Sequence, residues 1–200
     1  MSVLVGKQAP DFTLSAVMPD NSIKEDFNFS DYIKGKIAVL FFWPADFTFV
    51  CPSEIIAFNN KLEEFKEKGV VIAGCSIDSQ YVHYTWKNTP VEKGGIGQIQ
   101  FPMLADITGE VAKEYDILSD SKLAYRATFL IDQNGKVVHQ VVNDLSLGRN
   151  IDEVIRMIDA LLFTQQYGEV CPANWKKGEE GMKATVEGVS EYLSKHANNL

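Results

Sequence analysis

The sequence contains little cysteine and histidine, with three residues of each kind among 200. The cysteines are Cys51, Cys75 and Cys171, and no two of them form a C-x-x-C pair. Structural zinc sites usually take their ligands from closely spaced pairs, so we expect no local zinc site. The absence of C-x-x-C also argues against a disulfide-exchange protein, which usually carries both thiols on one loop.

The sequence also lacks basic excess and long apolar runs. Its net charge is -8, which argues against binding to nucleic acid or to an anionic membrane. No window reaches the roughly 18 apolar residues that a membrane span needs. The first residues, MSVLVGKQAPDF, lack the basic and apolar regions of a signal peptide. We therefore expect a cytoplasmic protein, in which cysteines are more often catalytic or sensing than structural.

Residues 37–43, IAVLFFW, are continuously apolar and rich in β-forming residues, which predicts a strand buried on both faces. Pro52 then marks a helix start, because proline is favoured in the first helical turn. Apolar residues follow at helical spacing, and residues 70–78, VVIAGCSID, predict a second buried strand. Residues 37–78 therefore predict a β-α-β unit with parallel strands and a right-handed crossover.

Further elements are predicted along the chain: a helix over 79–88, a loop over 88–102, a short helix near 108–115, a β-hairpin around Asn134-Gly135, an amphipathic helix over 150–165 and a polar arm with one short helix. In the helix over 79–88 we expect Tyr81, Tyr84 and Trp86 to be buried. This order of elements predicts an α/β protein with a mixed central sheet flanked by helices and followed by a C-terminal arm. Such a sheet fits the thioredoxin-like fold.

The sequence around Cys51 predicts a reactive thiol. The cysteine would lie in the first turn of the helix, where free backbone N–H groups and the helix dipole favour the thiolate, which is the nucleophile. The Thr48 hydroxyl can donate to the sulfur or to an oxygen bound beside it. Pro44 and Pro52 stiffen the loop and shield the thiol. A structural thiol is the alternative, but P-x-x-x-T-x-x-C-P at a strand-to-helix junction argues against it.

A partly shielded thiolate of this kind suits attack on a peroxide oxygen. Cleavage of the O–O bond places negative charge on the departing oxygen, and a nearby cation would stabilise that charge. Arg126 is the candidate cation, because it lies at the head of the predicted strand RATFLID. In a thioredoxin-like sheet that strand neighbours the strand before Cys51.

The other cysteines and two of the histidines receive different interpretations. Cys75 lies inside an apolar strand and is assigned to the core. Cys171 lies in the polar segment GEVCPANW, where it is either an incidental exposed thiol or the partner of a sulfenic acid formed at Cys51. His83 and His139 are interpreted as ordinary residues of a helix and a hairpin.

The sequence resembles the typical 2-Cys peroxiredoxins, close to the bacterial alkyl hydroperoxide reductase C subunit group. The resemblance covers nearly the whole chain and rests on APDFTL, FFWPADFTFVCPSEI, FPMLAD, YRATFLID, LGRNIDE and GEVCPANWKKGEEGMK. It implies that Cys51 is the peroxidatic cysteine, which a hydroperoxide oxidises to sulfenic acid. It further implies that Thr48 and Arg126 bind and polarise the peroxide oxygens and that Pro44 screens the sulfur.

The resemblance also assigns supporting roles. Glu54 would orient the arginines, Arg149 would support that network, and Cys171 would be the resolving cysteine, supplied by the partner subunit. A peroxidase domain is implied over residues 1–167, and an arm carrying the resolving cysteine over residues 168–200. The first turn of the active-site helix would unwind in each cycle so that the two thiols can meet.

The family works as homodimers, commonly five of them in a decamer, and uses no metal, haem or flavin of its own. Electrons would come from thioredoxin or a flavoprotein disulfide reductase. We favour thioredoxin, because NTPVEKGGIG resembles bacterial members that use it. Two alternatives remain, namely a general thiol–disulfide oxidoreductase on the same fold and a ring-forming holdase chaperone.

Overall fold

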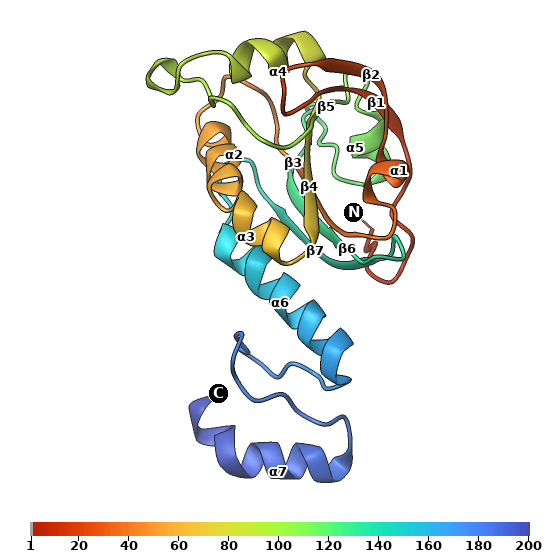
Figure 1. Ribbon diagram of the computed structural model, residues 1–200, viewed down its shortest axis with the longest axis vertical. Coiled ribbons are helices and arrows are strands. Elements are labelled where there is room, and N and C mark those ends of the chain that lie inside the picture. Colours follow the sequence, from red (N-terminus) through yellow and green to blue (C-terminus); the bar gives the residue numbers. More distant parts are fainter. Residues whose placement is uncertain (1) are drawn as a thin grey trace. The chain divides into compact units, whose positions relative to one another are not determined.

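The computed structural model describes residues 2–200 and contains a mixed seven-stranded sheet (Figure 1). The strands are β1 Thr13–Val17, β2 Ile23–Asn28, β3 Ile37–Phe42, β4 Val70–Ser76, β5 Met103–Ala105, β6 Arg126–Ile131 and β7 Val137–Asn143. The helices are α1 Phe29–Ile33, α2 Cys51–Asn60, α3 Leu62–Glu67, α4 Gln80–Lys87, α5 Glu110–Glu114, α6 Ile151–Tyr167 and α7 Val186–His196, with 3₁₀ turns η1 Val91–Lys93 and η2 Ala197–Asn199. Within residues 2–200, none of these helices combines the length and the apolar character that a membrane span requires.

The sheet has the strand order β2-β1-β5-β4-β3-β6-β7. Strand β3 lies between β4, which is parallel to it, and β6, which is antiparallel. Helices α2 and α3 connect β3 with β4, so the predicted β-α-β unit is confirmed. The mixed sheet flanked by helices is the thioredoxin-like arrangement that the sequence predicts.

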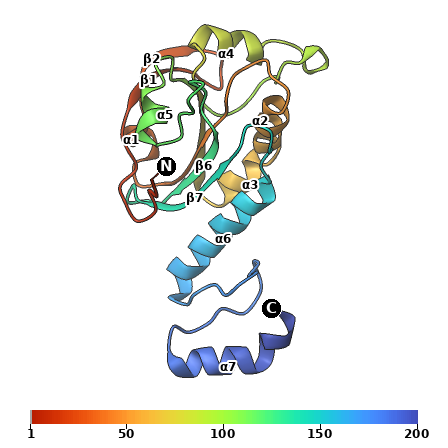
Figure 2. The ribbon, with the colours of Figure 1, turned by 180° about the vertical axis from the view of Figure 1, so that it is seen from behind.

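The side chains of β3 alternate between two apolar layers. Phe42 faces the layer of α1 and α5, where its ring lies 5.4 Å from that of Tyr115. Phe41 faces the opposite layer and stacks on Phe58 of α2 at 4.1 Å. Figures 1 and 2 show α2 and α3 on one side of the sheet and α1 and α5 on the other. Because both faces of β3 are covered, its sequence is apolar throughout.

The predicted hairpin is formed by β6 and β7, which pair antiparallel. Their connection turns at Gly135, which adopts a φ of 77° in the left-handed region that favours glycine. The Gly135 N–H donates to the Asp132 carbonyl at 2.9 Å and closes the turn. The predicted helices near 108–115 and over 150–165 correspond to α5 and α6.

Helix α4 forms where the sequence predicts it, but it buries a different face. Trp86 is buried as expected, whereas Tyr81 and Tyr84 are 64% and 43% exposed, so that part of the prediction is wrong. His83 and Lys87 are fully buried instead. Both have internal hydrogen-bond partners, which offset the cost of burying a polar group.

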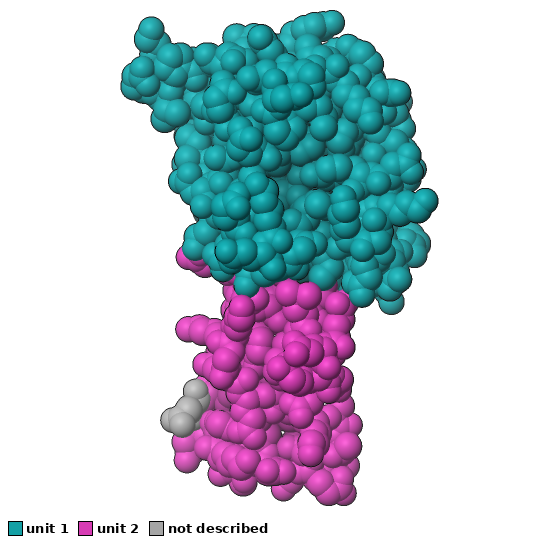
Figure 3. All heavy atoms as spheres, viewed as in Figure 1, with its two compact units in different colours: residues 1–151 teal, residues 152–200 magenta. Residues whose placement is uncertain are grey.

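The chain forms two compact units, Met1–Ile151 and Asp152–Leu200, which Figure 3 shows in different colours. In the second unit, the Arg156 guanidinium of α6 donates to the Trp175 carbonyl at 2.9 Å. The buried Trp175 ring lies 4.9 Å from that of Phe163. Because the arm packs on α6, the compact unit begins before residue 168. The predicted functional boundary between 167 and 168 stays a prediction.

Candidate active site

The loop after β3 leads to Cys51, which is the first residue of α2, as predicted. The thiol is completely buried, with 0% exposure, whereas the sequence predicts a partly shielded group. The difference arises because both the loop and β6 approach the sulfur. The Thr48 Oγ1 lies 2.9 Å from Sγ, and the Arg126 Nη1 lies 3.2 Å from it. A thiolate is the form of the sulfur that can accept from both donors at once.

Arg126 is the first residue of β6, and β6 pairs with β3, so the predicted neighbourhood is confirmed. Its Nη1 donates to Glu54 Oε2 at 2.8 Å as well as to the cysteine sulfur. Its Nε donates to the Leu145 carbonyl at 2.7 Å. The guanidinium is therefore held in place before any substrate binds, which is the condition for preorganised electrostatic stabilisation.

Glu54 follows Cys51 by three residues in α2 and is buried. Its Oε2 accepts from Arg126 Nη1 at 2.8 Å and from Arg149 Nη2 at 2.9 Å. Its Oε1 accepts from the backbone N–H and the Nε of Arg149, each at 2.9 Å. One carboxylate thus joins both arginines, and the Arg149 pair is bidentate, which is the strong geometry for such contacts.

Arg149 connects this network to the sheet. Its Nη1 donates to the carbonyls of Phe42 and Ala127 at 2.8 Å each, and its guanidinium lies 5.2 Å from the Phe41 ring centroid. Burial lowers the Arg149 pKa, and the hydrogen bonds to Glu54 oppose that shift. The side chain that the resemblance assigns to the arginine network is therefore in direct contact with Glu54.

The buried cluster of Arg126, Arg149 and Glu54 has a net positive charge that one anion would balance. Two guanidiniums and one carboxylate sum to +1 (+2 minus 1), and all three side chains are at most 4% exposed. An uncompensated buried charge is costly. A thiolate at Cys51, whose sulfur lies 3.2 Å from Arg126, would neutralise it. The oxygen that leaves during peroxide cleavage would also carry such a charge.

Thr48 has one hydroxyl proton and two possible acceptors. Its Oγ1 lies 2.8 Å from the Ala45 carbonyl and 2.9 Å from the Cys51 sulfur. When the sulfur is a thiol, it can donate to Oγ1 while the hydroxyl donates to Ala45. When the sulfur is a thiolate, the hydroxyl can turn and donate to it. The hydroxyl thus has a partner in both protonation states.

Replacing Thr48 with valine is expected to slow the reaction of Cys51 with peroxide by about 10- to 100-fold, because one donor to the sulfur is lost. Thr48→Ser keeps the hydroxyl and should stay within about fivefold of the wild type. Stopped-flow measurement of the second-order rate constant with hydrogen peroxide distinguishes the two. A wild-type rate in Thr48→Val together with a large loss in Thr48→Ser would mean that the methyl group, and not the hydroxyl, matters.

The two remaining predicted site residues have less defined surroundings. Pro44 is buried beside Trp43, and its screening role stays a prediction. Cys171 lies in the second unit, half-buried, with its Sγ 3.7 Å from the Ala160 carbonyl. Burial raises the Cys171 pKa, and the nearby Arg156 charge opposes the shift. Its resolving role also stays a prediction.

Cys75 is in the core, as predicted. It is fully buried in β4, and burial raises its pKa well above the ordinary value. An inert structural thiol has these properties. Among the three cysteines, only Cys51 has both a hydroxyl and a guanidinium within hydrogen-bond distance in the described structure.

Sequence reasoning missed a buried pair beside the site, formed by Asp46 and His83. One sequence pattern could have revealed the buried polar face of α4. Gln80, His83 and Lys87 follow one another at helical spacing, and all three are buried. Hydrophobicity alone instead assigns the aromatic residues to that face.

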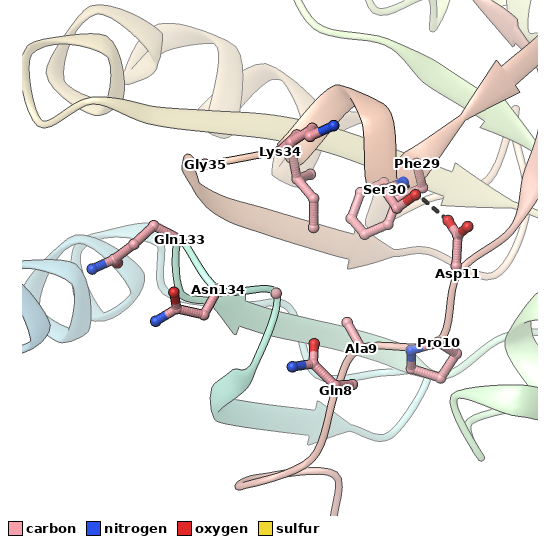
Figure 4. Close-up of a pocket in the computed structure, with 12 residues that line it drawn as sticks. Gln8, Ala9, Pro10, Asp11, Phe29, Ser30, Lys34, Gly35, Gln133 and Asn134 are labelled. Atoms are coloured by element: carbon pink, nitrogen blue, oxygen red, sulfur yellow. Dashed lines mark hydrogen bonds between the residues drawn. The ribbon is translucent and has the colours of Figure 1, made fainter.

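A separate pocket of about 250 Å³ is lined by the segment before β1, by α1 and the residues after it, and by the turn after β6 (Figure 4). Gln8, Asp11, Lys34 and Asn134 are among its lining residues. Gly35, which lines the pocket, precedes β3, whereas Cys51 follows the other end of that strand. The pocket therefore forms no part of the cysteine site.

Comparison with known proteins places the chain among the peroxiredoxins. Residues 5–140 match the model of the AhpC/TSA family, and residues 160–195 match the C-terminal domain of 1-Cys peroxiredoxin. Alkyl hydroperoxide reductase C of Helicobacter pylori is 56% identical over 198 residues, which cover 99% of this chain and 100% of that protein. Peroxiredoxin-2 of Mus musculus is 48% identical, with 96% of each chain covered.

Solved structures agree with these matches. The reduced 2-Cys peroxiredoxin of Plasmodium vivax superposes with a TM-score of 0.93 at 50% identity, covering 96% of this chain and 100% of that one. AhpC of Mycobacterium tuberculosis superposes with a TM-score of 0.73 at 35% identity, covering 81% and 99%. With these matches and a buried cysteine held by a threonine and an arginine, the chain belongs to the AhpC/TSA family of peroxiredoxins, which are thiol peroxidases.

Proposed function

We propose that this chain reduces hydrogen peroxide and organic hydroperoxides through Cys51, as part of an antioxidant defence. The observation that carries the proposal is the pair of donors on the Cys51 sulfur, Thr48 Oγ1 at 2.9 Å and Arg126 Nη1 at 3.2 Å. These donors can hold a thiolate and also the oxygen atoms of a bound peroxide. The relatives named as alkyl hydroperoxide reductase and peroxiredoxin support this assignment.

In the proposed reaction, the Cys51 thiolate attacks one oxygen of the hydroperoxide and the O–O bond breaks. The sulfur gains OH as sulfenic acid, and the other oxygen leaves as an alkoxide, or as hydroxide when the substrate is hydrogen peroxide. That oxygen takes up one proton to become an alcohol or water. The Arg126 guanidinium stabilises the negative charge on the leaving oxygen, while Glu54 and Arg149 hold Arg126 in place.

The sulfenic acid then condenses with the thiol of Cys171 of the partner subunit, releasing water and forming a disulfide. Because Cys51 is fully buried, the first turn of α2 must unwind to expose it. A dithiol, which we propose to be thioredoxin, reduces the disulfide in a reducing, cytoplasmic setting. The domain over 1–167 would carry the peroxide chemistry, the arm over 168–200 would supply the resolving thiol, and no metal, haem or flavin is required.

Assembly into homodimers and a decamer is part of the proposal. Two aromatic side chains of the loop before Cys51 are exposed, Phe49 by 99% and Phe47 by 50%. Exposed aromatic residues of this size often mark contacts between proteins. A contact between subunits at this loop would couple assembly to the position of Thr48.

The test is a thiol count combined with gel electrophoresis. One equivalent of hydrogen peroxide should lower the three thiols of the reduced chain to one and give a covalent dimer on a non-reducing gel. The Cys171→Ser variant should consume peroxide but form no dimer. A disulfide within a single chain would contradict the partner-subunit step, and unchanged thiols would contradict the peroxidase.

A further inference from the structure

Asp46 and His83 form a buried pair next to the cysteine loop. The His83 Nδ1 lies 2.7 Å from Asp46 Oδ2, and both side chains have 0% exposure. The other ring nitrogen, Nε2, lies 3.0 Å from the Leu104 carbonyl of β5. The pair therefore links the loop, helix α4 and the sheet.

The two contacts of the His83 ring need two protons, one on each nitrogen-to-oxygen contact. A neutral histidine facing a carboxylate supplies only one. The Leu104 carbonyl can only accept, so Nε2 carries a proton. If Nδ1 had none, its lone pair would face a carboxylate oxygen at 2.7 Å. Either His83 is an imidazolium facing a carboxylate, or Asp46 is protonated and donates to Nδ1. Both states hold the same number of protons, so one proton is shared between Nδ1 and Oδ2.

The groups around the pair come from each element that packs on it. Trp43, after β3, donates its Nε1 to Asp46 Oδ1 at 2.8 Å. Asp78, after β4, accepts from the Asp46 backbone N–H at 2.8 Å and is the second carboxyl group facing the pair. Burial raises the Asp46 pKa and His83 opposes that shift, while the charge of Asp78 adds to it. These contacts favour retention of the shared proton.

Asp46 stands two residues before Thr48, the threonine that contacts the Cys51 sulfur. Between Asp46 and Thr48, Phe47 adopts a φ of 54°, in the left-handed region that is unfavourable for a bulky side chain. Such a conformation persists only when its surroundings hold it. The Asp46 contacts hold one end of this turn, and the Thr48 hydroxyl, bound to Ala45 and Cys51, holds the other.

We propose that the protonated Asp46–His83 pair is a positioning device that keeps Thr48 against Cys51 in the closed loop. The proposal rests on the proposed peroxidase function. With the pair intact, the loop favours attack on peroxide. When the pair is broken, the loop opens more readily, so peroxide attack slows while the subsequent disulfide forms faster. Loss of the shared proton at alkaline pH weakens the same contacts, because the one ring proton that remains on His83 can serve Asp46 or the Leu104 carbonyl but not both.

An Asp46→Asn variant distinguishes the effect of the shared proton from the effect of the hydrogen bonds that hold the loop. Its side-chain oxygen can accept from Trp43, and its NH₂ group can donate to a neutral His83, whose Nε2 still donates to Leu104. Every hydrogen bond of the pair is kept, yet no shared proton remains to titrate. Asp46→Ala removes the contacts altogether.

The experiment follows both steps by stopped-flow in the full-length chain, from pH 6 to 10, in the wild type, Asp46→Asn and Asp46→Ala. A His139→Gln variant, which removes a histidine on β7, is the control and should follow the wild type. In Asp46→Ala we expect peroxide attack to slow by about tenfold and disulfide formation to become faster. It should also form less sulfinic acid at Cys51 at high peroxide, as measured by mass spectrometry.

In Asp46→Asn, both steps at neutral pH should stay within about threefold of the wild type, since the contacts are kept. The ratio of wild-type to Asp46→Asn rate constants for peroxide attack should fall as pH rises. A constant ratio, or an Asp46→Ala variant in which both steps slow together, would overturn the positioning role. Failure of the wild type to react with peroxide at all would instead overturn the proposed function. If Asp46→Ala does not fold, the Asp46→Asn ratio alone decides.

Discussion

A Cys51→Ser chain is expected to consume no hydroperoxide above the background rate. The serine hydroxyl is a far weaker nucleophile than a thiolate and forms no sulfenic acid. The surrounding donors would remain, since Thr48 and Arg126 are held by Ala45, Leu145 and Glu54 as well as by the sulfur. The measurement is peroxide loss over time in the presence of a dithiol.

The matched control is Cys75→Ala, which removes a thiol of the core and should keep peroxide consumption. The same variants separate the alternative functions. A holdase chaperone would protect unfolding client proteins equally well in the Cys51→Ser variant, and a wild type that protects clients but consumes no peroxide would favour that alternative. Disulfide exchange between model thiols without peroxide would favour the general oxidoreductase.

A Glu54→Ala chain is expected to lose about 3–5 kcal/mol of unfolding free energy. Removal of the carboxylate leaves the buried Arg126 and Arg149 charges unpaired, and breaking a buried ion pair in this way is costly. Glu54 neutralises one of two buried guanidiniums and accepts four hydrogen bonds from them and from one backbone N–H. Urea unfolding followed by circular dichroism measures the change.

A suitable control is Glu63→Ala, because Glu63 pairs with Lys66 at 2.8 Å but is 82% exposed. A surface pair of this kind contributes about 0–1 kcal/mol. If Glu54→Ala and Glu63→Ala lost similar amounts, the buried network would not stabilise the fold as we describe. Peroxide consumption by Glu54→Ala should also fall, since Arg126 would no longer be held from two sides.

The sequence predicts elements with a long apolar run or a clear periodicity and misses strands that are polar or very short. Strand β3 is predictable because covered faces require an uninterrupted apolar run. Strand β2, IKEDFN, has one buried residue and lies at the edge of the sheet, so its sequence resembles a loop. Strand β5 has only three residues, which is too short for a period to show.

The site shows the same division between near and distant residues. Thr48 stands three residues before Cys51, within the motif P-x-x-x-T-x-x-C-P. Glu54 is equally near, but its role followed from the family resemblance. Arg126 was found through the strand order of the fold and not through spacing. The contact of Arg149 with Glu54 followed only from the family resemblance, because the two residues lie 95 positions apart.

The sequence by itself determined the core of the fold, the helix start at Cys51 and the family, because apolar periodicity, proline placement and motifs are local properties of a chain. Only the tertiary structure decided which face of α4 is buried, that Cys51 is completely enclosed, and that Asp46 pairs with His83. A polar side chain can be buried only where another group satisfies it, and that group comes from 37 residues away.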